Sequence, residues 1–226
     1  MKKLLITIDG PAGAGKTTVS RTLADRLGYR YIDTGALYRA VALAVKTRGC
    51  NPENDAEIKR VCAEIELTFV QKEEGLCLFL NREDITDRIR TAEITMLASA
   101  ISARPVVREY LLNFQKNLGK EKAAVFEGRD MGTVVFPEAD LKFFLDASTR
   151  ARALRRYDEL KSNSTQTLAE VGLDIQRRDR NDSTRELAPL KPAQDAIMVD
   201  STDLNVAEVV ELMISHTQKF QQDLQK

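Results

Sequence analysis

Apolar runs and helical repeats alternate along almost the whole chain. Leu4–Ile8 is a continuous apolar run, typical of a buried strand. Val19, Leu23 and Leu27 then recur at helical spacing, and Gly28 is a typical helix terminator. The same reasoning predicts strands at 29–32, 123–126, 141–145 and 196–199, and helices at 36–48, 56–65, 91–103, 105–118, 149–161, 165–178 and 206–220. Strands alternating with helices in this way predict an α/β fold with a five-stranded parallel core sheet and helices on both faces.

One segment departs from this alternation. Leu67–Val70 and Leu76–Leu80 are short apolar runs, and the polar residues Glu73–Gly75 between them suit a turn, so the pattern predicts a β-hairpin. A hairpin that lies between helices does not belong to a simple βαβ repeat. Residues from about 64 to 90 are therefore predicted to form an insert containing a small antiparallel β element.

A glycine-rich loop joins the first predicted strand to the first predicted helix, and it matches G-x-x-x-x-G-K-[ST] at every defined position. Backbone N–H groups of such a loop turn toward a phosphate, and the helix adds the positive end of its dipole. Lys16 is expected to reach the β- and γ-phosphates of a nucleoside triphosphate, and the Thr17 hydroxyl to ligate Mg²⁺. The expected nucleotide contacts are Gly10, Pro11, Ala12, Gly13, Ala14, Gly15, Lys16, Thr17 and Thr18.

Composition and charge argue against several other classes of protein. The 226 residues carry 34 basic and 34 acidic side chains, so no net field favours nucleic acid or a membrane surface. No 18-residue apolar run is present, and a strand begins directly after Met1–Lys3, which leaves no room for a signal peptide. Three cysteines without C-x-x-C spacing indicate reduced thiols, and the single histidine, His216, makes histidine-based catalysis improbable. We expect a cytoplasmic protein.

Further polar clusters follow the second and third predicted strands. Asp33–Arg39 comes after the second strand; Thr34 suits a helix cap, while Arg39 can fork onto a phosphate. Glu127–Thr133 comes after the third strand and has glycines on both sides of Arg129 and Asp130. A surface ion pair is the alternative for these two residues, but their place at a strand end favours a loop that faces a ligand.

Two weaker features lie elsewhere in the chain. Ser99 and Arg108 stand nine residues apart on two predicted helices. Four arginines occur within the nine residues Arg177–Arg185, a pattern that is usually a solvated helix face. The proline-punctuated segment 188–192 follows this cluster, which favours a mobile flap that returns to the sheet.

Taken together, these motifs resemble those of the bacterial cytidylate kinases, a branch of the nucleoside monophosphate kinases. The resemblance runs over nearly the whole chain and rests on ITIDGPAGAGKTT, YIDTGALYR, EGRDMGTVVFP, LDAS and RDRNDSTRELAPL in this order. It implies a three-layer P-loop fold over 1–226 as a single kinase domain. Within this domain it implies a monophosphate-binding region at 34–118, which holds the insert at about 64–90, and a helical lid at about 150–190.

The resemblance also implies a reaction, in which the γ-phosphoryl group of ATP is transferred to CMP and dCMP with Mg²⁺ as cofactor. Contacts to the acceptor phosphate map onto Thr34, Arg39, Arg129 and Arg185, and three guanidiniums around one phosphate also stabilise charge in the transition state. Lys16, Arg39, Arg129 and Arg185 are accordingly the expected catalytic residues. Thr34 stands where serine is common in the family, and this change preserves the hydroxyl group.

The remaining nucleotide contacts are implied in the same way. Base contacts map onto Ser99, Arg108 and Asp130, with Ser102 as an alternative to Ser99 if the register slips. Asp130 can accept from the N4 amine of cytosine, whereas it repels the O4 acceptor of uracil. Ribose contacts map onto Arg178 and Asp182, Tyr38 lines the pocket, and Arg152 and Arg156 of the lid close over ATP. Asp33 and Asp130 are both candidates for a carboxylate near Mg²⁺. No exposed heptad suggests a dimer, so a monomer that binds neither nucleic acid nor membrane is expected.

Two other functions stay open on the sequence alone. The acceptor can be another small molecule, such as UMP or a metabolite that is not a nucleotide. A GTP-binding switch acting through protein partners shares the P-loop, but such a protein normally carries N-K-x-D, and the sequence has no such motif.

Overall fold

The computed structural model describes residues 2–72, 75–161 and 165–225. The chain forms two compact units, one of Met1–Ile32 together with Glu121–Lys226 and the other of Asp33–Lys120. Glu73 and Glu74 of the predicted hairpin turn lie outside the described residues, and so do the polar residues 162–164 between two predicted helices. Each unit has its own hydrophobic core.

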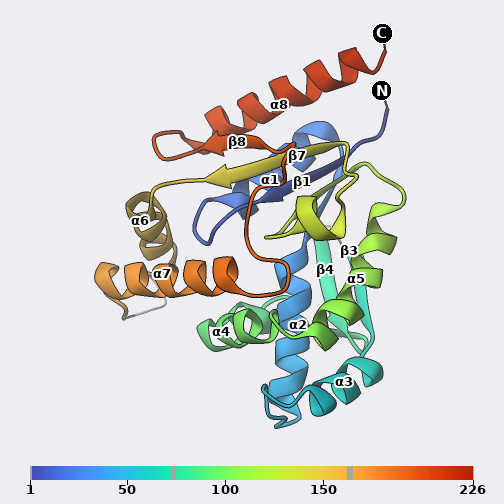
Figure 1. The fold of residues 1–226 in the computed structure, drawn as a ribbon, viewed down its shortest axis with the longest axis vertical. Helices are drawn as coiled ribbons and strands as arrows, with labels where there is room; N and C mark the ends of the chain where they lie inside the picture. Colours follow the sequence, from blue (N-terminus) through green and yellow to red (C-terminus); the bar gives the residue numbers. More distant parts are fainter. Residues whose placement is uncertain (1, 73–74, 162–164, 226) are drawn as a thin grey trace. The chain divides into compact units, whose positions relative to one another are not determined.

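The first unit is built on a five-stranded parallel sheet with the order β2-β6-β1-β7-β8, which confirms the predicted core sheet (Figure 1). Because the central strand β1 has β6 on one side and β7 on the other, the strand order reverses there, and ligands of such sheets bind at the carboxyl end of this point. The strands are β1 (Leu5–Asp9), β2 (Arg30–Asp33), β6 (Ala124–Glu127), β7 (Leu141–Asp146) and β8 (Ile197–Asp200).

Helices α1 (Lys16–Leu27) and α8 (Val206–Asp223) share one core cluster with the strands of this sheet. Leu23 of α1 and Met213 of α8 are completely buried in this cluster. As predicted, α1 ends at Gly28, whose left-handed backbone (φ 66°) lets its N–H donate to the carbonyls of the last helical turn. The amphipathic patterns of both helices were therefore sufficient to predict them.

Helices α6 (Thr149–Leu160) and α7 (Leu168–Thr184) lie side by side and bury Ala153, Val171 and Ile175 between them (Figure 1). The sequence predicted that the second of these helices ends at residue 178, and this was wrong. The helix continues to Thr184, so Arg177, Arg178 and Arg180 lie in its last turns, and Arg185 directly follows the helix.

In the second unit, three helices pack around α2 (Thr34–Thr47), whose Leu37, Val41 and Val45 are completely buried. The predicted hairpin is present as β3 paired antiparallel with β4, but β5 adds a third strand that the sequence did not predict. A strand of two residues has no period to detect. The other elements of this unit are α3 (Asp55–Glu64), β3 (Leu67–Lys72), β4 (Gly75–Leu80), β5 (Glu83–Asp84), the short 3₁₀ helix η1 (Arg88–Arg90), α4 (Ala92–Ile101) and α5 (Pro105–Gly119).

Over the described ranges of the chain, every helix is too short or too polar to cross a bilayer.

Replacing Leu23 with alanine tests the core of the first unit. The side chain is fully buried between strands and helix α8, so Leu23→Ala should lower the free energy of unfolding by about 2–5 kcal/mol, measured by urea denaturation. Leu173→Ala is the matched control, because Leu173 is 65% exposed on α7 and its truncation should change stability by less than about 0.5 kcal/mol. Equal losses in the two variants would contradict this account of the core.

Candidate active site

The glycine loop between β1 and α1 adopts a backbone that side chains do not tolerate. Gly10 has φ 150° and Gly13 has φ 76°, both in the region that favours glycine. Space is short as well, since a Cβ at Gly10 would overlap the carbonyl oxygen of Leu145, and one at Gly13 would lie 2.9 Å from the carbonyl oxygen of Arg152. The glycines of the motif are therefore required by close approach to β7 and α6.

Carbonyl groups of this loop are bound by cationic side chains of the first unit. Lys16 Nζ donates to the carbonyl of Pro11 (2.7 Å), Arg152 Nη1 to that of Ala12 (3.0 Å) and Arg155 Nη1 to that of Ala14 (3.5 Å). No side chain caps the N-terminus of α1. The loop carbonyls therefore have donors within the protein. The N–H groups of the first turn of α1 have no side-chain cap, so they are available to an anion.

Lys16 is buried among charged groups of both signs. Its side chain is 4% exposed, and burial lowers its pKa from 10.5 to about 7, with a further decrease from the charge of Arg129. The carboxylates of Glu127 and Asp182 act in the opposite direction. A buried amine without a carboxylate in direct contact is suited to a polyphosphate, which can supply the missing negative charge.

The Thr17 hydroxyl lies against a carboxylate that the sequence analysis did not single out. Thr17 Oγ1 donates to Glu127 Oε1 (2.9 Å), and the Tyr31 hydroxyl holds Glu127 Oε2 (2.6 Å). The signal was available in the sequence, because Glu127 directly follows the third core strand, where P-loop proteins place an acid near the metal. A hydroxyl and a carboxylate are oxygen ligands that suit Mg²⁺.

The two carboxylates considered from the sequence have other partners within their own units. Asp33 caps α2 and binds Arg39, and Asp130 lies 3.6 Å from Arg185. Glu127 is therefore the better candidate for the acid near Mg²⁺.

The segment after β6 gathers four of the predicted substrate-binding residues. Arg129 Nε donates to Asp182 Oδ2 (3.0 Å), and Arg185 Nη2 lies 3.6 Å from Asp130 Oδ1 and its Nη1 4.0 Å from Asp182 Oδ1. Asp130 and Asp182 are 2% and 6% exposed, so these are buried charges that require partners. Arg178 of α7 contributes to the same field, since its charge lowers the pKa of Lys16.

A second carboxylate that the sequence analysis missed supports this segment. Asp9, the last residue of β1, accepts the backbone N–H groups of Met131 (2.9 Å) and Gly132 (2.8 Å). Burial raises the pKa of Asp9 from 3.8 to about 6. No sequence signal identifies this contact, because the partners are backbone groups more than a hundred residues away along the chain.

In the second unit, α2 carries three predicted residues near its start, namely Thr34, Tyr38 and Arg39. Thr34 suits a helix cap by its sequence position, but its side chain does not cap α2. Asp33 is the cap, and its carboxylate accepts the N–H of Ala36 (3.1 Å) and an ion pair from Arg39 (2.7 Å). The carboxylate is preferred because it accepts both groups at once and lies at the positive end of the helix dipole.

The predicted base-binding residues of this unit also lie together. The Arg108 guanidinium stands 5.8 Å from the centroid of the Tyr38 ring, and Arg108 Nη1 donates to the carbonyl of Ser102 (3.0 Å). The hydroxyl of Ser102 donates to the carbonyl of Ser99 (2.8 Å). Ser99 Oγ is buried and has no hydrogen-bond partner among the described residues, so Ser99 has the hydroxyl with unused capacity for a ligand.

The two arginines predicted to close over ATP have different environments. Arg152 is buried, and besides the carbonyl of Ala12 it binds Asp179 Oδ2 (2.7 Å) and the carbonyl of Ala147 (2.9 Å). Arg156 is more exposed and binds Glu159 of its own helix (2.8 Å). Arg152 thus links α7 to the glycine loop, and contact of either arginine with ATP stays a prediction.

Comparison with known proteins identifies the family of the chain. A family model described as cytidylate kinase matches residues 6–219. The cytidylate kinase of Geobacter sulfurreducens is 51% identical over 214 residues (94% of this chain, 91% of that protein), and that of Syntrophotalea carbinolica is 45% identical over 226 residues (98% and 94%). The crystal structure of an uncharacterised protein from Eubacterium ventriosum has a TM-score of 0.52 at 13% identity, covering 96% of this chain and 99% of its own, and it shares the fold. The chain therefore belongs to the cytidylate kinase family.

Proposed function

We propose that the protein transfers the γ-phosphoryl group of ATP to CMP and dCMP, which gives CDP and dCDP. The observation that carries the proposal is the cluster formed by Lys16, Arg129, Asp130, Asp182 and Arg185 at the carboxyl end of the core sheet. Its cations suit two phosphate groups, and its carboxylates suit the ribose hydroxyls and a base amine. Membership of the cytidylate kinase family supports the same acceptor.

The residues act by positioning and charge stabilisation. The glycine loop and Lys16 hold the polyphosphate of ATP, while Arg129, Arg185 and Arg39, together with the hydroxyl of Thr34, hold the acceptor phosphate. The acceptor oxygen of CMP is already anionic, so no protein base is needed, and the rate depends on alignment of two anions that repel each other. The guanidiniums also stabilise the charge that spreads over the transferring group.

For the acceptor nucleoside, Asp130 accepts from the N4 amine of cytosine, and Ser99 and Arg108 donate to the ring acceptors. Arg178 and Asp182 bind the ribose, and Tyr38 lines the pocket. The unpartnered hydroxyl of Ser99 supports this assignment, because a buried polar group without a partner costs free energy unless a ligand binds it.

Thr17 and Glu127 would hold Mg²⁺, and Tyr31 orients the carboxylate. When bound, the ion neutralises charge on the phosphate oxygens. Among the described residues, no three histidine, cysteine, aspartate or glutamate side chains gather in a way that could hold a metal ion.

An assay with a panel of acceptors tests the proposed function. ADP formation from ATP should depend on the acceptor, with CMP and dCMP preferred over UMP, which offers no amine to Asp130, and over AMP, whose amine lies on the larger purine ring. The measurement is a coupled assay of initial rates for the four acceptors. Preference for AMP, or slow nucleotide hydrolysis that needs no acceptor, would favour the other functions considered from the sequence.

Proton uptake tests the assignment of Lys16. Its pKa of about 7 leaves the amine largely neutral at about pH 8, and the negative charge of ATP raises this pKa, so binding should take up close to one proton. Calorimetry of ATP binding in buffers of different ionisation enthalpy measures the uptake. Lys16→Gln should abolish it, whereas Lys122→Gln, which removes a lysine bound to Asp140, should leave it unchanged. ATP binding without proton uptake would contradict the assignment.

Asp130→Asn tests how the base is recognised. The amide can donate to O4 of uracil, so the preference for CMP over UMP, as the ratio of kcat/KM values, should fall by about 1–3 kcal/mol. Any effect of the change on Arg185 acts on both acceptors and cancels in the ratio. Asp195→Asn, at an exposed position bound to Lys142, is the control. An unchanged ratio in Asp130→Asn would show that another group reads the base.

A further inference from the structure

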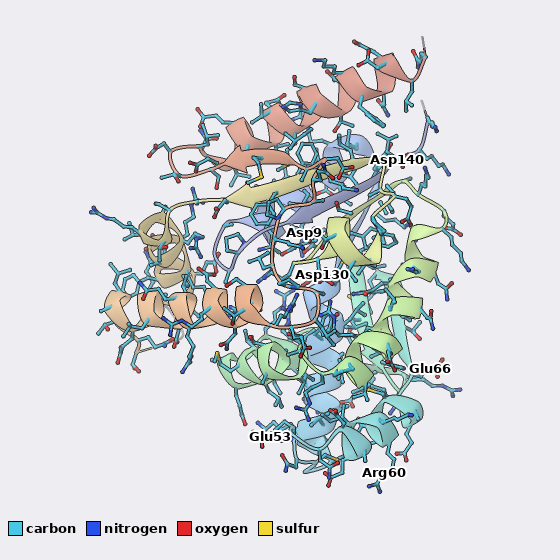
Figure 2. All side chains as sticks on the ribbon, viewed as in Figure 1. Asp9, Glu53, Arg60, Glu66, Asp130 and Asp140 are labelled. Atoms are coloured by element: carbon cyan, nitrogen blue, oxygen red, sulfur yellow. The ribbon has the colours of Figure 1, made fainter. Side chains whose placement is uncertain are left out.

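Asp9 is a buried carboxylate whose measured partners are backbone groups of the acceptor-binding segment. Figure 2 labels Asp9, at the end of β1, and Asp130, which precedes the two residues whose N–H groups Asp9 accepts. The side chain is 4% exposed, and each of its two oxygens accepts one N–H, at 2.9 and 2.8 Å. Both oxygens of the carboxylate are thus engaged by two consecutive amides.

Those amides begin the π-helical turn η2 (Met131–Val135), which directly follows Arg129 and Asp130. The turn is closed by two hydrogen bonds, from the N–H of Val135 to the carbonyl of Asp130 (3.2 Å) and from the N–H of Phe136 to the carbonyl of Met131 (2.7 Å). Gly132 is tightly enclosed, since a Cβ there would lie 3.1 Å from Thr7 Oγ1 and 3.4 Å from Asp9 Oδ2. The position of Arg129 and Asp130 therefore depends on where Asp9 holds the start of the turn.

We propose that Asp9 is a positioning residue for the acceptor nucleotide, which holds the start of η2 so that Arg129 and Asp130 face CMP, and that it does so only as a carboxylate. The proposal rests on the proposed function. It adds a residue that does not itself touch the substrate. It also connects the last residue of β1, which leads into the ATP-binding loop, to the segment that binds the acceptor.

Protonation of Asp9 weakens one of its two hydrogen bonds to η2. A carboxylic acid keeps one good acceptor oxygen and places an O–H donor against the second amide. The charged groups that act on Asp9 are Asp130, which favours the protonated form, and Lys16 and Arg129, which favour the carboxylate. Lys142 passes Gly132 but directs its amine to Pro137 and Asp195. Burial outweighs the two hydrogen bonds, so the pKa is raised to about 6 and Asp9 titrates within a range open to experiment.

The first test uses the unmodified protein without substrates. In ¹H–¹⁵N NMR spectra, the amide signals of Met131 and Gly132 should shift together with pH, with a midpoint near 6, because both lose a charged acceptor when Asp9 is protonated. Amide signals that stay constant between about pH 5 and pH 7.5 would overturn the proposal. This result does not depend on CMP being the substrate, so it separates failure of the proposal from failure of the proposed function.

The second test compares Asp9→Asn with Asp140→Asn. The Asp9 variant keeps one acceptor and turns an NH₂ group toward the second amide, so KM for CMP should rise about tenfold to a hundredfold at about pH 7.5, while the Kd for ATP should change less than about threefold. Asp140 is the matched control, because it also accepts a backbone N–H of β1, that of Leu5 (2.8 Å), at the other end of the strand (Figure 2). Its replacement can lower stability but should leave KM for CMP within about twofold of the unmodified value.

The pH dependence of KM distinguishes positioning from a merely structural role. The phosphate of CMP titrates near pH 6 as well, but it affects both proteins equally. The ratio of KM in Asp9→Asn to KM in the unmodified protein should therefore be large at about pH 7.5 and approach one at about pH 5, where Asp9 is protonated. A ratio that does not change with pH, or equal losses of ATP and CMP binding, would overturn the proposal. If the variant does not fold, the amide titration decides alone.

Discussion

Buried positive charge is the constraint on which the site depends. A protein that binds two phosphate-bearing ligands must assemble cations before the ligands arrive, and a buried cation without a partner is strongly unfavourable. Here each of three proposed phosphate-binding arginines is held by a carboxylate of its own unit. Arg129 binds Asp182, Arg185 lies near Asp130 and Arg39 binds Asp33. These carboxylates supply the partner that each guanidinium requires within its own unit.

This arrangement also explains why the carboxylates suit binding of the acceptor. When a phosphate approaches Arg185, the guanidinium exchanges one anionic partner for another and does not lose its hydration at that moment, so little reorganisation is needed. In the proposed complex, Asp130 then turns to a donor on the base, and Asp182 to ribose hydroxyls. Lys16 differs from the arginines, because its closest measured partner is the neutral carbonyl of Pro11. Without a carboxylate in direct contact, burial lowers its pKa, whereas the arginines stay charged.

The sequence was sufficient to predict those helices and strands that a local pattern of apolar residues specifies. The strands of the core sheet and helix α1 follow from apolar runs, helical spacing and Gly28. The pattern failed where it is short, as for β5, or where charged residues form a helix without a clear apolar stripe, as at the end of α7. In the site, motifs identified Arg129 and Asp130, and Glu127 could have been found from its place after a strand. Asp9 could not, because its contact depends on the pairing of β1 with β6, which only the folded sheet creates.

Asp9 differs physically from the other acids of the site. Asp130 and Asp182 are paired with guanidiniums, which stabilise their charge, whereas Asp9 accepts two uncharged backbone donors and lies near Asp130. Hydrogen bonds to two amides do not compensate for full burial, so the pKa of Asp9 rises toward the neutral range. An apolar residue there would avoid this cost but would leave two buried N–H groups without acceptors. A titratable group at the end of β1 is therefore a consequence of holding two buried backbone N–H groups of the acceptor segment with a side chain.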